Sequence, residues 1–136
     1  MTKEEIMDLE GRELDKAVAE LKGWSHFYTV EGRGLFGRYP PPRLSCPNDT
    51  KCVPEFSTDI SAAWPLLEEI HTKPYSVEVF LVHECENEIK YIVNVLLMHE
   101  FTEDLMADRS MISVFGDTAP EAICRAYLLW KESQDD

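Results

Sequence analysis

The hydrophobic and polar positions near the start of the chain predict a helical region. Thr2 and Glu5 have the spacing of a capping box, and the apolar residues that follow, as far as Gly23, recur at approximately helical spacing. An interior glycine costs about 1 kcal/mol relative to alanine, so we expect Gly11 to divide this region into a short turn and a longer helix. Gly23 then provides the C-terminal stop.

Two further helices are expected, one in the middle of the chain and one near its end. Over residues 57–72, apolar side chains recur at i, i+3, i+4 and i+7, and Pro65 predicts a kink because it removes a backbone hydrogen bond. Thr118 can cap the last helix. Between residues 122 and 130 only Arg125 is polar, so this helix must pack against neighbours on several sides.

Alternating patterns predict an antiparallel sheet between these two helices. Residues 75–84 and 89–98 alternate as strands joined by a turn, and residues 110–115 supply a third short strand. Apolar side chains lie on both faces, so a second helical layer or a subunit interface should cover each face. The expected fold is therefore α+β, an alpha-beta-alpha sandwich with an antiparallel sheet of about three strands and helices packed on its faces.

The remaining segments show no regular periodicity. Residues 24–56 contain repeated glycines and prolines and predict a long irregular loop, which is uncommon inside a compact domain unless it is functional. The polar, acidic tail, residues 131–136, is expected to fray. With 136 residues, the chain fits a single domain over residues 1–136.

The composition is that of an acidic globular protein. Hydrophobic residues make up 44% of the chain, and the formal net charge is −13. This charge argues against general nucleic-acid binding, which depends on Lys and Arg contacts to phosphates. No apolar run approaches the roughly 18 residues of a membrane span, and no secretory signal is recognisable. We expect a cytoplasmic protein that does not bind membranes.

A local exception to the acidity lies within the predicted loop. Arg33, Arg38 and Arg43 fall in a stretch without acidic residues, together with the aromatic residues Phe36 and Tyr39. Guanidinium groups hold phosphates in a bidentate fashion, and aromatic rings stack on bases. These five residues are the predicted ligand-binding site, for a small nucleotide rather than a duplex. The alternative is a surface loop whose arginines pair with nearby acids, which contributes little energy.

The same loop offers a weaker metal-binding pattern. Cys46 and Cys52 have Cys-x5-Cys spacing, with Asp49 between them, and His26 lies earlier in the loop. Structural zinc sites prefer four ligands and tighter cysteine spacing, so we expect no cofactor and keep zinc as a low-ranked alternative. In a reducing compartment, the four cysteines of the chain are expected to be thiols.

No catalytic constellation is recognisable in the sequence. Asp59 and Asp117 stand at helix starts, where capping explains a carboxylate, and His71 and His83 lie near element ends. Nothing aligns a nucleophile, a base and an orienting group, so we expect a protein that is not an enzyme. The aromatic side chains expected in the core include all three tryptophans, Trp24, Trp64 and Trp130.

Three motifs carry a family resemblance. Residues 11–15 running to Gly23 and Trp24, then residues 56–64, then residues 116–126 together resemble the phage ABA sandwich family, small proteins encoded by bacteriophages and prophages. The resemblance implies an alpha-beta-alpha sandwich and brings no established enzymatic chemistry, so it implies no catalytic residue. Pro65 departs from the family, which usually has a better helix former there.

A second resemblance covers only the later half of the chain. The hairpin followed by residues 116–123 is similar to the end of a HicB-type antitoxin domain. We therefore expect a non-enzymatic phage or prophage accessory protein in the cytoplasm of an infected or lysogenic bacterial host. Its expected function is anti-defence binding of a small nucleotide-type signal. The alternatives are an acidic protein–protein inhibitor or antitoxin-like module that binds a host protein, and a small zinc-containing domain. Homo-oligomerisation would also explain the apolar sheet faces.

Overall fold

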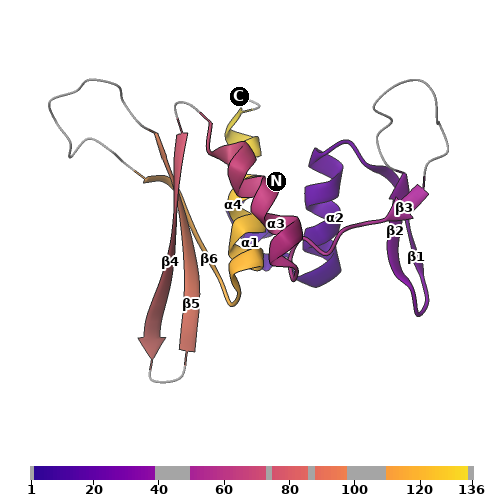
Figure 1. Ribbon diagram of the computed structural model, residues 1–136, viewed down its shortest axis with the longest axis horizontal. Helices are drawn as coiled ribbons and strands as arrows, with labels where there is room; N and C mark the ends of the chain where they lie inside the picture. The colour runs from indigo at the N-terminus through magenta and orange to yellow at the C-terminus, as the bar shows by residue number, and fades with distance from the viewer. Residues whose placement is uncertain (1, 39–49, 73–74, 86–87, 98–109, 135–136) are drawn as a thin grey trace, which may run out of the picture.

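The described residues of the chain form four helices and two three-stranded antiparallel sheets. A computed structural model describes residues 2–38, 50–72, 75–85, 88–97 and 110–134. The helices are α1 (Lys3–Asp8), α2 (Gly11–Leu21), α3 (Ile60–Ile70) and α4 (Ala119–Gln134). The small sheet contains β1 (Ser25–Val30), β2 (Gly34–Arg38) and β3 (Thr50–Cys52) in that order, and the large sheet contains β4 (Tyr75–Cys85), β5 (Glu88–Leu97) and β6 (Ser110–Gly116). The helices lie between the two sheets (Figure 1).

The large sheet confirms the predicted α+β class and the predicted strand pairing. Val77 pairs with Val95 and Val79 with Val93, so these apolar side chains of the two strands share one face. On that face, Val93, Val95 and Val114 are buried. The opposite face carries Phe80 and Phe115, which are exposed, so no layer within the described residues covers these two rings.

Helix α4 forms the centre of the core. It packs on β5 and β6 and against the other three helices, and most of its side chains are buried. Arg125 is 5% exposed, and its guanidinium donates to the carbonyl oxygens of Phe115 (3.0 Å) and Leu9 (3.1 Å). The same group forms an ion pair of 2.6 Å with Glu121. One buried side chain therefore connects α4 with the end of α1 and with β6.

Gly116 is required by the short connection between β6 and α4. A Cβ atom at this position would lie 2.8 Å from the backbone nitrogen of Ala122, so any larger residue would displace the backbone. The helix itself starts as expected, because the Glu121 amide donates to the Thr118 hydroxyl at 3.3 Å.

A buried carboxylate joins α2 to the segment before α3. Asp15 is 1% exposed; it accepts hydrogen bonds from the Ser57 amide (2.7 Å) and from Arg12 Nη1 (2.8 Å). The Ser57 hydroxyl donates to the Gly11 carbonyl oxygen at 3.1 Å. The carboxylate is thus satisfied from two sides, as burial of a charge requires.

Arg12 extends this network to the small sheet. Its Nη2 atom donates to the carbonyl oxygens of Leu35 and Val53, each at 3.2 Å. A second contact between α2 and the small sheet is made by Lys16, whose ammonium lies 5.6 Å from the centroid of the Phe27 ring. The position of the small sheet on the helices therefore depends on Arg12 and, through it, on Asp15.

The prediction that residues 24–56 form a long irregular loop is wrong for the part that the structure describes. Gly32 and Gly34 have φ angles of 81° and 104° and form the tight turn between β1 and β2. Gly37 lies inside β2. This position requires glycine, because a Cβ atom there would come within 2.9 Å of the Phe27 ring. Glycines that usually interrupt structure are here required by a hairpin and by close packing.

The end of α4 also differs from the prediction, whereas the start of α3 at Asp59 agrees with it. Helix α4 continues to Gln134 and so includes most of the tail predicted to fray, and in this tail Lys131 forms an ion pair with Glu69 at 3.3 Å; residues 135–136 lie outside the described residues. Helix α3 begins after its N-cap Asp59 and contains Pro65 within its span. In the parts of the chain that the structure describes, no helix is long and apolar enough to cross a membrane.

Glu69 links three helices through its carboxylate. It accepts a hydrogen bond from the Tyr127 hydroxyl (3.1 Å) and forms ion pairs with Lys22 (3.4 Å) and Lys131 (3.3 Å). Burial by itself raises the pKa of Glu69, but Lys22, Tyr127 and Lys131 together lower it below the ordinary value of 4.5. Burial raises the pKa of the Tyr127 hydroxyl strongly, and the Glu69 charge adds to this effect, so Tyr127 remains a donor.

We predict that replacing Asp15 by Asn destabilises the protein by about 2–4 kcal/mol, because the change leaves Arg12 and the Ser57 amide with a weaker acceptor in a buried site. Urea denaturation followed by circular dichroism measures the free energy of unfolding. Glu13→Gln, at an exposed position of the same helix, is the control and should be nearly neutral. Equal losses for the two variants would show that the Asp15 carboxylate does not join these elements.

Glu69 predicts a pH-dependent contribution to stability. Because its folded-state pKa is lowered, the stabilisation is present above the ordinary pKa of 4.5 and is lost as the pH falls through the folded-state pKa. We expect Glu69→Gln to lower the free energy of unfolding at pH 7 by about 0.5–1 kcal/mol, a modest value because the carboxylate is partly solvated. This difference should disappear in strong acid. Glu68→Gln, at the exposed neighbouring position, is the control and should change the free energy of unfolding at pH 7 by less than Glu69→Gln does. A difference for Glu69→Gln that persists in strong acid would contradict the assignment.

Candidate functional site

The structure places three of the five predicted ligand-binding residues on the β1–β2 hairpin. Arg33 is exposed in the turn after β1, and Phe36 and Arg38 lie on β2. Burial alternates along β2, with Leu35 and Gly37 buried, so Phe36 and Arg38 face away from the helices. Tyr39 and Arg43 lie outside the described residues, so their prediction stays open.

A second aromatic residue, which the sequence analysis missed, stands beside Phe36. Tyr28 on β1 pairs with Phe36, and their rings are stacked, with centroids 5.7 Å apart and planes inclined by 14°. On the other side of β2, Phe36 pairs with Cys52 and Arg38 with Thr50. We call Tyr28, Phe36 and Arg38 the aromatic face. Aromatic residues are common in strands, so Phe27 and Tyr28 could have indicated a strand in the sequence. The glycines that follow them indicated a loop instead.

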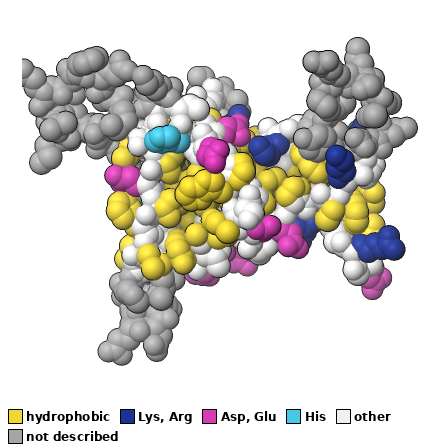
Figure 2. All heavy atoms as spheres, viewed as in Figure 1, with side chains coloured by type: hydrophobic (Ala, Val, Ile, Leu, Met, Phe, Trp, Pro, Cys, Tyr) yellow, Lys and Arg dark blue, Asp and Glu magenta, His cyan; other side chains and the backbone are white. Residues whose placement is uncertain are grey.

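The small sheet is locally basic in an acidic protein. Between residues 25 and 38 and between residues 50 and 53, the basic residues are Arg33, Arg38 and Lys51, and Glu31 is the acidic residue. Lys and Arg side chains are visible over this sheet on the right of the view in Figure 2. The positive charge predicted from the sequence is therefore carried by an ordered sheet as well as by a turn.

A bulge in β1 sets the position of Tyr28. The register shifts between Ser25 and Tyr28, and within this shift His26 adopts a φ of 53°, which is uncommon for a residue other than glycine. The Ser25 hydroxyl lies 3.0 Å from His26 Nδ1. Because a bulge adds one residue to a strand, it turns Tyr28 to the same face as Phe36.

The candidate zinc ligands are only partly described. His26 and Cys52 lie on the two outer strands of the small sheet and are separated by β2, while Cys46 lies outside the described residues. Within the described ranges, no group of three or more His, Cys, Asp or Glu side chains could hold a metal ion. The structure does not bring His26 and Cys52 into one site, and zinc binding remains a prediction.

Of the candidate acid and base residues, Asp59 has a structural role. Asp59 caps α3 by accepting a hydrogen bond from the Ser61 amide at 2.9 Å. Cys124 lies in the core, and burial, followed by the charges of Asp15 and Glu121, raises the pKa of its thiol strongly. Such a thiol is a poor nucleophile. The side chain of His83 is not described.

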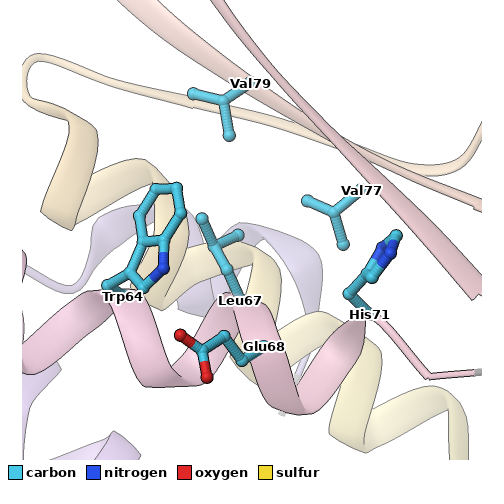
Figure 3. Close-up of a pocket in the computed structure, with 6 residues that line it drawn as sticks. All are labelled: Trp64, Leu67, Glu68, His71, Val77 and Val79. Atoms are coloured by element: carbon cyan, nitrogen blue, oxygen red, sulfur yellow. The ribbon is translucent and has the colours of Figure 1, made fainter.

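A second candidate site is an apolar groove between α3 and the edge strand β4. Its volume is about 530 Å³. Figure 3 shows Trp64, Leu67 and His71 extending from α3 towards the two valines of β4, with Glu68 at the rim. The lining residues are Trp64, Leu67, Glu68, His71, Val77 and Val79.

The groove exists because the helices cover the large sheet unevenly. Helix α4 packs on β5 and β6, whereas α3 packs mainly on α4 and contacts β4 only lightly. Val79 is consequently 42% exposed, although its cross-strand partner Val93 is fully buried. Figure 2 shows hydrophobic side chains gathered over α3 and the large sheet.

Trp64 corrects the prediction that all three tryptophans belong to the core. Trp24 and Trp130 are each 7% exposed, but Trp64 is 53% exposed. The buried stripe of α3 consists of Ala63, Leu66, Leu67 and Ile70, which leaves Trp64 at its edge.

The groove residues on α3 carry a signal that the sequence analysis missed. Residues 64, 67, 68 and 71 have the i, i+3, i+4, i+7 spacing of one helix face, and this face includes the polar residues Glu68 and His71. A mixed apolar and polar stripe beside a bulky tryptophan is typical of a boundary with solvent rather than of a sealed core.

We predict that Trp64 accounts for most of the quenching of tryptophan fluorescence by acrylamide in the folded protein. Trp64→Phe should remove most of the quenchable signal, because the other two indoles are buried. Trp24→Phe is the control and should leave the quenching largely unchanged. If Trp64→Phe has no effect, the groove is covered in solution.

Comparison with known families agrees with the resemblance seen in the sequence. The Phage ABA sandwich domain matches residues 46–128, which is more than half of the chain. The matched segment contains α3, the large sheet and most of α4, and therefore the whole groove, whereas Tyr28, Phe36 and Arg38 precede it. The comparisons do not show the similarity to HicB-type antitoxin domains. No curated protein and no solved structure gives a significant match. Because the match covers more than half of its length, the chain belongs to the Phage ABA sandwich domain family.

Proposed function

We propose that this protein is a non-enzymatic phage or prophage accessory protein that binds a small nucleotide-type ligand on the aromatic face. The observation that carries the proposal is the stacked pair of Tyr28 and Phe36 beside Arg38 on one open face of the small sheet. Membership of a phage domain family fits an accessory role during infection or lysogeny.

The aromatic pair supplies a surface for a base. Tyr28 is exposed, and Phe36 is only partly buried, so ring surface remains accessible outside the sheet. Stacking of one base on an aromatic side chain contributes about 1–3 kcal/mol and tolerates different bases. Two parallel rings held on neighbouring strands are ordered in advance, which reduces the entropy that binding would otherwise cost.

The basic residues supply the contacts for a phosphate. Arg38 lies next to Phe36 on the same face, and Arg33 lies in the adjoining turn. A guanidinium group binds phosphate oxygens through two parallel hydrogen bonds. A small ligand with one base and one or two phosphates fits this arrangement. A nucleic-acid duplex is larger, so its phosphates would also come close to the acidic remainder of the chain, which would repel them.

Binding without turnover would suit an anti-defence protein that sequesters a nucleotide signal of the host. Such a protein needs affinity for the signal and no catalytic group. Sequestration requires only that the protein be present in excess over the signal. The proposal therefore predicts a ligand that is released unchanged when the protein is denatured.

A protein–protein inhibitor is the alternative function, and the apolar groove favours it. Exposed apolar side chains around α3 and β4 are typical of a protein-binding surface. A complex guided by the acidic charge of the chain would weaken steeply as the salt concentration rises, whereas a stacked nucleotide would be less sensitive.

We predict that native mass spectrometry of the protein purified from its bacterial host shows a bound nucleotide-sized mass, and that calorimetric titration with cyclic and ADP-ribose-type nucleotides detects a binder. Tyr28→Leu and Arg38→Gln should each weaken binding by about tenfold or more, because each removes a stacking or phosphate contact. Lys3→Gln, an exposed cation on α1, is the matched control and should bind normally.

Two results would contradict the proposal. One is the absence of binding across the whole nucleotide panel by a protein that carries no ligand from the host. The other is full binding after replacement of Arg33, Arg38 and Arg43 together, which would place the ligand elsewhere.

A further inference from the structure

We propose that the groove between α3 and β4 binds an extended segment of a partner protein, which adds as a strand to the edge of β4 and places a Lys or Arg side chain in the groove. This surface is separate from the aromatic face, because the helices lie between the two sheets (Figure 1). The inference therefore does not depend on the proposed nucleotide site.

The edge of β4 is available for strand pairing. The strand has 11 residues and pairs with β5 on one side; no strand of the described chain pairs with its other side. An edge strand presents a row of backbone donors and acceptors, which is a template for another chain. An added strand would continue the antiparallel or parallel ladder of the large sheet.

The side chains of β4 do not protect this edge. From Tyr75 to Val82 the charged residue is Glu78, and this stretch contains no proline and no lysine. Val79, Phe80 and Leu81 are exposed. Natural proteins protect long edges with charges, prolines or bulges, so a long apolar edge of this kind is typical of an interaction site.

The helix beside the edge turns it into a groove for alternate side chains. The face formed by Trp64, Leu67, Glu68 and His71 runs along β4, opposite Val77 and Val79 (Figure 3). In strand-addition complexes, backbone hydrogen bonds supply affinity, and pockets for every second side chain supply specificity. From Val77 to Leu81 the edge spans about 13 Å at about 3.3 Å per residue, enough for a segment of about five residues.

The lining of the groove favours a long cationic side chain. Its walls are apolar, formed by Trp64, Leu67 and the two valines, and the carboxylate of Glu68 stands at the rim. Lys and Arg bury an aliphatic stem while keeping the charged end in water, and the indole face attracts a cation. The formal charge of −13 would also accelerate the approach of a basic partner.

Charge argues against a second copy of this chain as the occupant. Pairing of two β4 edges would bring together two chains of net charge −13, each with Glu68 and Glu78 near the contact. Among the described residues that line the groove, none is a lysine or arginine that could pair with these acids in the other copy. A basic segment of a different protein is the complementary occupant.

The experiment selects binders from a display library of random seven-residue segments, with the full-length protein as the target. We expect alternating segments with Lys or Arg at one fixed position. For a synthetic peptide of the selected sequence, Glu68→Lys should weaken binding by about tenfold or more, and selection against that variant should enrich Asp or Glu instead. Glu13→Lys, an exposed charge reversal on α2, is the control.

Backbone methylation tests strand addition itself. Two series of the selected peptide are N-methylated at alternate positions. One series lacks the backbone donors that would face β4, and the other lacks the donors that would face away. The first series should lose binding, and the second should keep it. Equal behaviour of the two series would overturn the strand model. Failure to enrich any segment would overturn the proposal. A dimer in native mass spectrometry that Leu81→Lys dissociates would assign the edge to a second copy instead.

Discussion

The buried carboxylate of Asp15 is the interaction on which the arrangement of the molecule depends. It holds Arg12 in place, and Arg12 in turn binds the carbonyl oxygens of two segments of the small sheet. Asp15 also fixes the Ser57 amide two residues before the cap of α3. Since Asp15 precedes the segment matched to the family and Ser57 lies inside it, this contact joins the two parts of the chain into one structure.

The packing of α4 explains the second candidate site. A helix that lies over β5 and β6 cannot also cover β4, and α3 is held to α4 and α2 by contacts around Glu69. The space beside β4 is therefore a consequence of how the core is built. The groove lies entirely within the matched segment, whereas the aromatic face depends on β1 and β2, which precede that segment.

The sequence predicted the large sheet well because its signals are local. Val77 and Val79 lie on one face of β4, and the residues between and beside them lie on the other face. Residues 89–98 show the same period of two, and this shared pattern predicted that β4 and β5 pair. The small sheet was missed because its glycines have long-range causes: Gly37 is required by the ring of Phe27 on another strand, and this contact has no local signature. Trp64 was misplaced for a related reason, since helical spacing identifies a stripe but not whether the neighbouring sheet reaches it. In both candidate sites, tertiary contacts of this kind decide which residues form strands and which side chains are exposed.

The net charge of the chain and the local charge of the small sheet act over different distances. At physiological ionic strength, charges are screened beyond about 8 Å, so a small anion at the aromatic face would respond mainly to Arg33 and Arg38. A nucleic acid or an acidic protein would extend beyond this distance and meet the acidic surface, which disfavours it. The same acidity favours a basic segment at Glu68. This separation of charge would allow the proposed anion site on the small sheet and the proposed groove for a cationic segment to operate without either compromising the other.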